Sequence, residues 1–335
     1  MKTLKAGIIG LGVGEKHIQA YESHPDCEVI ALCDFAEEKF FKAAQKYPGI
    51  NITRDAGEIL SDPKINVVSI ASFDNYHFEQ VMKAIQNDKH VFVEKPLCLH
   101  QSEAIQIRSL LRKNSHIKIS SNLNLRTCPR FKWLKNAIHA GHMGQIYYIE
   151  ADYLWGRLQK LCNGWRKEMD FYSIVHGAAV HMIDLVLWLT GMTPVEVQGY
   201  GSKISTLGSD FKYNDFATIL IKFNNGMIAK VSANGGCVHP HFHKLTLYGT
   251  RKTFIHDIGG AKLLNCRNPQ SEIKDINEEY PGQEKGDIIY SFIQSILHSN
   301  AEAIVTDYDV FTTMSVCFAA EKAIKEGQPT TIQYI

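Results

Sequence analysis

The stretch AGIIGLGVG (residues 6–14) decides the first part of the fold. Residues 6–9 form a short apolar run typical of a buried strand, and three glycines then follow at alternate positions. A helical segment begins at about Glu15. A strand, a glycine-rich turn and a helix in this order are the context in which the amides of a helix N-terminus bind phosphate. The predicted phosphate loop consists of Gly10, Leu11, Gly12, Val13 and Gly14.

The glycine spacing differs from the usual dinucleotide-binding fingerprint, which would place the third glycine at Glu15. Here the third glycine, Gly14, comes one residue early. We expect Gly14 to do the same work in a shortened loop, because a carboxylate beside a pyrophosphate would repel it. A glycine-rich turn that binds no ligand is the simpler alternative.

An acidic residue ends the second predicted strand. Asp34 comes 24 positions after Gly10, close to the spacing of the acid that binds the adenosine ribose hydroxyls. Phe35 and Ala36 follow, and they offer no group for a 2′-phosphate. NAD is therefore the expected cofactor, and Lys39 leaves NADP as an alternative.

Strand-like and helix-like segments alternate through residues 1–122, which predicts a doubly wound parallel sheet. The predicted strands are 6–9, 28–33, 66–71, 90–93 and 117–121. In residues 123–335 the strands follow one another more directly, which predicts a second, α+β domain with a largely antiparallel sheet. The strands predicted there are 148–155, 196–204, 216–223, 227–233 and 244–249, and the helices lie near 130–140, 178–190, 287–298 and 307–325.

The composition is typical of a soluble globular protein. The chain has 335 residues, 45% of them hydrophobic, and a net charge of +1, which indicates neither a nucleic-acid nor a membrane surface. No apolar run approaches the roughly 18 residues of a membrane span. Glu15, Lys16 and His17 interrupt the weakly signal-like N-terminus too early. The eight cysteines are scattered without a Cys-x-x-Cys pair, so a reducing, cytoplasmic location is expected.

The stretch HVFVEKPLCL (residues 90–99) places an acid and an amine directly after a predicted strand. Glu94 and Lys95 follow that strand, and Pro96 lacks the N–H that would continue a ladder. Because ligands bind at the strand ends of a doubly wound sheet, this tripeptide is a candidate part of the site. A surface ion pair is the simpler alternative.

Taken in order along the chain, these motifs resemble the glucose–fructose oxidoreductase and inositol dehydrogenase family (Gfo/Idh/MocA). The matching segments are 7–17, Asp34, 71–77 (ASFDNYH), 90–98, 124–126 with Pro129, 165–166, 177–191 and 247–250. The resemblance implies an NAD(P)-binding Rossmann domain and an α+β domain with an open, mostly antiparallel sheet. It also implies hydride transfer between nicotinamide and a carbinol carbon of a sugar, sugar nucleotide or cyclitol, in a homo-dimer or homo-tetramer.

The resemblance also assigns roles to the matching residues. Lys95 would lie beside the nicotinamide and the substrate hydroxyl, and His181, helped by Lys95, would remove the hydroxyl proton. The other expected cofactor contacts are Ser72, Phe73, His77, Glu94 and Arg166, and the expected substrate contacts are Lys95, Arg126, His181 and Asp184. A core or helix-capping role for His77, and a structural salt bridge for each arginine, are equally weighted alternatives.

The match has a gap at Gly177, where sugar dehydrogenases of the family commonly carry an aspartate that orients the catalytic histidine. His176, one position earlier, is the candidate substitute and a third expected catalytic residue. Five residues of a continuous helix rotate by about 140°, so His176 and His181 can face one site only if a helix begins between them. Restoring Gly177→Asp is expected to alter the pH dependence of the rate.

Three histidines alternate at His239, His241 and His243, and on an extended strand they would point to one face. Such spacing can ligate zinc or copper. The family uses no metal, and neither a carboxylate nor a cysteine partner is evident from the spacing. No metal is therefore expected, and contact with substrate or with another subunit is the preferred role.

Two other functions stay open at this point. The first is a cofactor-binding sensor or partner protein with weak or no catalysis, which Gly177 favours and Lys95 and His181 oppose. The second is a reductase of a non-sugar substrate, such as an imine, a diol or a tetrapyrrole. The sequence chooses neither the substrate nor the direction of the reaction in the cell.

Overall fold

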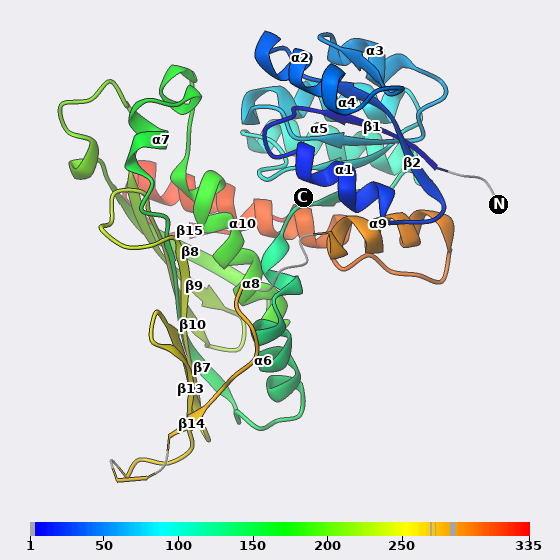
Figure 1. Cartoon of the computed structure of the whole chain (residues 1–335). Helices are drawn as coiled ribbons and strands as arrows, with labels where there is room; N and C mark the ends of the chain where they lie inside the picture. Colours follow the sequence, from blue (N-terminus) through cyan, green and yellow to red (C-terminus); the bar gives the residue numbers. More distant parts are fainter. Residues whose placement is uncertain (1–3, 269, 272, 282–285) are drawn as a thin grey trace. The chain divides into compact units, whose positions relative to one another are not determined.

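The computed structural model describes residues 4–268, 270–271, 273–281 and 286–335, which divide into two compact units (Figure 1). The first unit contains residues 4–123, residues 286–311 and Ile335, and the second contains residues 124–281 and 312–334. The expected second domain, residues 123–335, is therefore interrupted by a segment that groups with the first unit.

The first unit contains the predicted doubly wound sheet. In its described part, six strands pair in the order β3-β2-β1-β4-β5-β6, and every pair is parallel. Its elements are β1 (Leu4–Ile9), α1 (Glu15–Glu22), β2 (Cys27–Cys33), α2 (Glu37–Lys46), β3 (Asn51–Thr53), α3 (Ala56–Ser61), β4 (Val67–Ile70), η1 (Asp74–Tyr76), α4 (His77–Gln86), β5 (His90–Val93), α5 (Gln101–Lys113), β6 (Ile119–Ser121) and α9 (Asp287–Leu297). The parallel sheet expected from the strand–helix alternation is confirmed.

Helix α9 packs on the first unit although its sequence lies far along the chain. Phe292 of α9 has its ring 6.0 Å from that of Phe92 in β5, and both side chains are almost fully buried. On the side facing α1, Gln294 hydrogen-bonds to His24 at 2.8 Å, and the Tyr290 ring lies 4.7 Å from the His24 ring. These apolar and hydrogen-bonding contacts of α9 explain why residues 286–311 group with the sheet of β1 to β6.

The second unit is built on a larger sheet. Its strands pair in the order β14-β13-β12-β11-β7-β10-β9-β8-β15 among the described residues. Its elements are η2 (Asn124–Thr127), α6 (Pro129–His139), β7 (Ile146–Leu154), α7 (Leu158–Cys162), η3 (Trp165–Glu168), a π-helix (Val175–Ala179), α8 (Val180–Thr190), β8 (Pro194–Ser202), η5 (Ile204–Thr206), β9 (Phe216–Phe223), β10 (Ile228–Asn234), β11 (Phe242–Gly249), β12 (Thr253–Asp257), β13 (Gly260–Leu264), β14 (Lys274–Asp275) and β15 (Thr330–Thr331). The mostly antiparallel sheet is confirmed, with β7 and β10 as a parallel pair. Helix α10 (Asp307–Glu326) contributes residues to both units.

Helix α8 lies against the middle of this second sheet. It packs on β7 and β10, and Figure 1 shows α6 and α8 on the same side of the sheet. Nearly all of α8 is buried, which is why its sequence is apolar on every side rather than along one stripe. The helix ends at Gly191, whose φ of +63° is the left-handed conformation that glycine adopts at low cost. No helix in the described part of the chain has the length and apolarity needed to cross a membrane.

Candidate cofactor and substrate sites

The glycine loop connects β1 to α1 in the first unit. Gly10 has a φ of +90°, and a Cβ there would lie 2.3 Å from the carbonyl oxygen of Ala71, so only glycine fits. A Cβ on Gly14 would lie 2.2 Å from the Gly10 carbonyl oxygen. Among the described residues beyond its chain neighbours, an added Cβ at Gly12 would meet within 4 Å only Nζ of Lys39, at 3.2 Å. Gly10 and Gly14 thus permit close packing of the backbone, while Gly12 leaves the backbone open to a pyrophosphate.

Glu15, which stands where the usual fingerprint has its third glycine, is engaged with other residues. Its carboxylate accepts hydrogen bonds from Lys46 at 2.8 Å and from the Tyr47 hydroxyl at 3.4 Å. The hydrogen bond from Lys46 lowers the pKa of Glu15 below its ordinary value despite partial burial. Because Lys46 neutralises it, this carboxylate is compatible with a bound anion beside Gly14.

Asp34 joins the glycine loop to the end of β2. Its carboxylate accepts the backbone N–H of Leu11 at 2.8 Å and that of Ala36 at 2.9 Å. The side chain is 4% exposed, and Nζ of the half-exposed Lys39 lies 3.5 Å from Oδ2. These residues fit an adenine dinucleotide. Lys39 adds a cation next to the expected ribose position, so the structure keeps the NADP alternative that the sequence left open.

Glu94 is held inside the first unit, at the C-terminal end of β5. Asn122 donates to its Oε1 at 2.6 Å, and Nε2 of His17 lies 3.2 Å from the same oxygen. His17 is in turn 2.8 Å from the hydroxyl of Ser69. Burial alone would raise the pKa of Glu94, but the hydrogen bond and charge of His17, the charge of Lys95 and the Asn122 hydrogen bond together lower it. Glu94 is therefore an ionised anchor rather than a surface residue.

Lys95 is partly exposed between two fixed neighbours. On one side is Glu94, and on the other is Pro96, whose carbonyl oxygen accepts Nδ1 of His77 at 2.6 Å. The Lys95–Pro96 peptide bond is cis. His77 is fully buried, and its Nε2 lies 3.2 Å from the carbonyl oxygen of Ser72. These ring contacts of His77 match the core role that the sequence left as an alternative to cofactor contact, because they join the loops after β4 and β5. A neutral imidazole donates to only one of the two carbonyl oxygens.

The other two residues predicted on the β4 loop have side-chain partners in the first unit. The Ser72 hydroxyl donates to Gln80 at 2.7 Å, and the Phe73 ring meets the exposed ring of Phe35 edge-on at 5.5 Å. The phenylalanine pair places aromatic surface beside Asp34, which is where an adenine would be expected. Contact of these residues with the cofactor stays a prediction.

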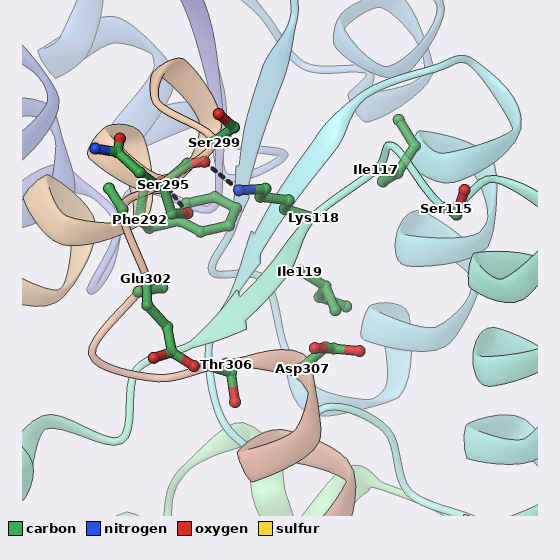
Figure 2. Close-up of a pocket in the computed structure, with 13 residues that line it drawn as sticks. Ser115, Ile117, Lys118, Ile119, Phe292, Ser295, Ser299, Glu302, Thr306 and Asp307 are labelled. Carbon is green, nitrogen blue, oxygen red and sulfur yellow. Dashed lines mark hydrogen bonds between the residues drawn. The ribbon is translucent and has the colours of Figure 1, made fainter.

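A cavity of about 410 Å³ lies elsewhere on the first unit, beside the start of β6 (Figure 2). Its lining includes Lys118, which donates to the carbonyl oxygen of Ser295, together with Glu302 and Thr306. The cavity borders Ser115, Ile117, Lys118 and Ile119, which precede or begin β6. Asp34 and Glu94, in contrast, follow the C-terminal ends of their strands. It is therefore not part of the dinucleotide site.

The two predicted catalytic histidines of the second unit have different surroundings. The ring of His181, on α8, lies 5.7 Å from that of Tyr153 and 6.3 Å from that of His243. The ring of His176, in the π-helix, lies 5.4 Å from that of Phe318. The helical backbone is continuous from His176 to His181, because the π-helix runs directly into α8. The ring contacts of His181 include polar side chains of the sheet, and those of His176 include Phe318 of α10. An orienting role for His176 stays a prediction.

Tyr172 fills the space that an aspartate at position 177 would need. A Cβ on Gly177 would lie 2.6 Å from the Tyr172 hydroxyl oxygen and 3.1 Å from Cζ of the same ring. Tyr172 is 3% exposed. The sequence did not single out this tyrosine, because nothing local indicates that its ring turns toward Gly177.

Arg126 and Asp184, both expected to contact substrate, bind each other. The Arg126 guanidinium donates from Nη2 to Oδ1 at 2.6 Å and from Nε to Oδ2 at 3.0 Å, and both side chains are buried. Thr313 adds a hydroxyl 3.4 Å from Oδ1. A buried bidentate pair of this kind is the structural salt bridge that the sequence left as the alternative for Arg126.

Arg166 lies among aromatic rings rather than against a carboxylate. Its guanidinium carbon is 4.3 Å from the ring centroid of Trp165, 5.2 Å from that of Trp155 and 5.8 Å from that of Tyr172. Within the described chain Arg166 makes no ion pair with an acidic side chain. An arginine stacked in this way keeps its N–H groups for an anion or a polar ligand, and the expected cofactor contact stays a prediction.

The alternating histidines near β11 bind protein groups. Nδ1 of His239 is 2.7 Å from the Pro240 carbonyl oxygen, and Nε2 of His241 is 2.8 Å from the Tyr153 hydroxyl. Nδ1 of His243 is 2.7 Å from the Tyr280 hydroxyl oxygen. Within the described residues, no three histidine, cysteine, aspartate or glutamate side chains gather in a way that could hold a metal ion.

Two family models match the chain in the order of its two domains. Residues 4–122 match the model described as an oxidoreductase family with an NAD-binding Rossmann fold, and residues 131–255 match the GFO/IDH/MocA C-terminal domain. The chain belongs to the Gfo/Idh/MocA family. It is an NAD-binding oxidoreductase, which confirms the family, the fold and the cofactor expected from the sequence.

Individual relatives of this family member are distant. An uncharacterized oxidoreductase YrbE of Bacillus subtilis is 23% identical over 99% of this chain and 98% of its own length. A myo-inositol 2-dehydrogenase of Thermotoga maritima is 23% identical over 76% of this chain and 75% of its own. A solved levoglucosan dehydrogenase in complex with NADH has a TM-score of 0.86 at 20% identity, covering 99% of this chain and all of its own. At such identities the structural likeness shows the fold.

Proposed function

We propose that this protein is an NAD-dependent dehydrogenase or reductase that acts on a carbinol carbon of a sugar, sugar nucleotide or cyclitol. The observation that carries the proposal is the fixed backbone around Lys95. Glu94 on one side is tied to Asn122 and His17, and Pro96 on the other is tied to His77. An amine positioned by buried groups at a strand end of an NAD-binding domain suits a reacting group better than a surface ion pair.

Each proposed catalytic residue has one role. His181 accepts the proton of the substrate hydroxyl in oxidation and returns it in reduction, and Lys95 donates a hydrogen bond to the same oxygen. Bound NAD would supply the hydride acceptor. Tyr153 and His243 beside His181 are both uncharged near neutral pH, because burial raises the pKa of Tyr153 to about 12 and lowers that of His243 to about 3. Such a lining offers hydrogen bonds without charge, which suits a neutral polyhydroxylated ring.

The names of relatives support this substrate class. They include the myo-inositol 2-dehydrogenase noted above and a D-glucoside 3-dehydrogenase of Escherichia coli that is 24% identical over 70% of this chain. The open sheet of the second unit also supports the proposal of a homo-oligomer, since family members commonly associate through that face.

The test is a substrate screen with variants. The purified protein is incubated with NAD⁺ or NADP⁺ and a panel of cyclitols, glycosides, uronic acids and sugar nucleotides, and reduced nicotinamide is followed by absorbance. For any substrate found, His181→Ala and Lys95→Met should each lower kcat by a factor of about 10² or more, with little change in NADH affinity. If both act in the same step, the double variant should lose much less than the product of the single losses. Unchanged turnover in His181→Ala would refute the assignment.

One observation favours a second function, that of a cofactor-binding protein with weak catalysis. Tyr172 occupies the space where related sugar dehydrogenases carry the carboxylate that orients the histidine. In that case the protein would bind NADH tightly and turn over no member of the panel, nor any imine, diol or tetrapyrrole added to it.

A further inference from the structure

His243 and Tyr280 make two hydrogen bonds that determine which nitrogen of the histidine carries a proton. The Tyr280 hydroxyl oxygen lies 2.9 Å from the backbone nitrogen of His243 and 2.7 Å from Nδ1 of its ring. The backbone N–H can only donate, so the hydroxyl oxygen accepts there. No other described residue accepts the hydroxyl proton, and the arrangement that satisfies all the groups has Tyr280 donating to Nδ1.

Nδ1 of His243 is therefore an acceptor, and the ring proton is on Nε2. The ring is also uncharged, because burial and the neighbouring His241 and His256 lower the pKa of His243 to about 3. Its charge is hence insensitive to pH across the neutral range. Tyr153 stacks on the ring with centroids 4.7 Å apart and planes within 25°, which fixes the ring plane as well as the tautomer.

The Nε2–H group of His243 is not used by the described protein residues. None of them accepts a hydrogen bond from it, although the His243 side chain as a whole is buried. His256 offers a contrast: Arg130 donates to its Nδ1 at 3.1 Å, and its Nε2 is sealed from solvent without a partner. Nε2 of His243 is not among the sealed, unpartnered atoms. It can therefore reach a ligand or water.

We propose that Nε2–H of His243 is a fixed, uncharged hydrogen-bond donor to an oxygen of the substrate, and that Tyr280 holds it in that state. The inference rests on the proposed function and goes beyond it in naming the residue and the group that it recognises. The partner oxygen is a hydroxyl, ring ether or carbonyl oxygen of a neutral sugar or cyclitol. An N–H group can donate a hydrogen bond but cannot accept one, so it binds an oxygen that offers a lone pair. The His181 ring, 6.3 Å away, places this contact beside the proposed base.

The groups that face His243 support a neutral donor rather than a base. Tyr153 faces it from β7, His241 from the segment before β11, Tyr280 from the loop after β14, and His181 from α8. His256 on β12 is a further neighbour, and its charge also disfavours a charged His243 ring. No carboxylate of the described residues pairs with the ring. Without such a partner, and with a pKa of about 3, the imidazolium form of His243 is disfavoured.

The tautomer is tested without substrate. Protein labelled with ¹⁵N in its histidine rings is examined by long-range proton–nitrogen NMR between pH 5 and 9, and the His243 signals are assigned by their loss in His243→Gln. A single neutral Nε2–H tautomer is expected across this pH range. Tyr280→Phe should give a mixture of the two neutral tautomers of His243. An Nδ1–H tautomer, or titration with an ordinary histidine pKa, would overturn the proposal.

Substrate contact is tested on the NADH-bound protein with myo-inositol and methyl glucoside as probes. Saturation by either should shift the Nε2 signal of His243. For the substrate found in the screen, His243→Phe should raise KM about five- to tenfold with kcat little changed, as expected for one neutral hydrogen bond. His243→Gln, which keeps an N–H donor, should recover part of that loss, and the NADH affinity of both variants should match that of the parent.

The outcomes separate this inference from the proposed function. A probe that binds, as seen by NADH fluorescence, while the His243 signal stays still and KM is equal in all variants would overturn the inference and leave the dehydrogenase intact. Absence of binding and turnover across the whole panel would overturn both.

Discussion

The Tyr172 hydroxyl that occupies the side-chain space of Gly177 leads to a quantitative prediction. A Cβ at position 177 would lie 2.6 Å from that oxygen, well inside ordinary van der Waals contact. Gly177 does not have a positive φ, so its backbone accepts alanine, and alanine is by itself favoured over glycine in a helix by about 1 kcal/mol. We therefore expect Gly177→Ala to destabilise the second unit by about 1–3 kcal/mol, entirely through overpacking against the tyrosine.

A double-mutant cycle isolates that contact. Tyr172→Phe removes the oxygen at 2.6 Å, so Gly177→Ala in that background should cost much less, with a coupling free energy of about 1–2 kcal/mol. The four tryptophans all lie between residues 133 and 188 in the second unit, so tryptophan fluorescence during urea unfolding reports this unit specifically. A Gly177→Ala variant as stable as the parent, with no coupling to position 172, would refute the placement of the hydroxyl.

The same contact changes the expectation for Gly177→Asp. The sequence alone predicts that the restored carboxylate alters the pH dependence of the rate. Because Tyr172 fills that space, the single variant should mainly lose stability, and a changed pH profile should appear only when Tyr172 is shortened as well. If Tyr172→Ala and the double variant Tyr172→Ala with Gly177→Asp have the same pH dependence of the rate, a carboxylate at position 177 does not reach His181.

Three further predictions concern the ion pairs. Arg126→Met should destabilise the second unit by about 3–5 kcal/mol in urea unfolding, because it removes the cation that pairs with the buried Asp184 carboxylate. The double variant Arg126→Met with Asp184→Leu should recover most of that stability. Equal losses of stability in the single and double variants would argue against a buried pair. The lowered pKa of Glu94 means that its contribution to stability is present above the ordinary value of 4.5 and is lost as pH falls through the lower folded value. Glu94→Gln should therefore cost about 1.5–3 kcal/mol at pH 7, by urea unfolding followed with far-ultraviolet circular dichroism, and the difference from the parent should narrow below about pH 4; a difference independent of pH would contradict it. Lys39→Ala should weaken NADPH binding up to about fivefold in a fluorescence titration with little effect on NADH, and an equal loss for both would place Lys39 at the pyrophosphate instead.

Local patterns in the sequence were sufficient for most of the elements, for the two kinds of sheet and for the NAD-binding domain. The apolar run before Gly10 and the acid at Asp34 each predict structure within a few residues of themselves. A period of two or 3.6 residues sets which face of an element is buried, and a missing side chain decides where a turn can form. These effects act over one element, so they can be read without knowing what lies opposite.

Partner choice, in contrast, was decided only by the tertiary structure. Arg126 meets Asp184 across 58 positions, and Tyr280 reaches His243 across 37. Whether an arginine binds a substrate or a buried carboxylate, and whether a histidine carries its proton on one nitrogen or the other, depends on which distant groups share its surroundings. The free energy that selects those neighbours comes from packing the whole unit, and no short stretch of the chain contains it.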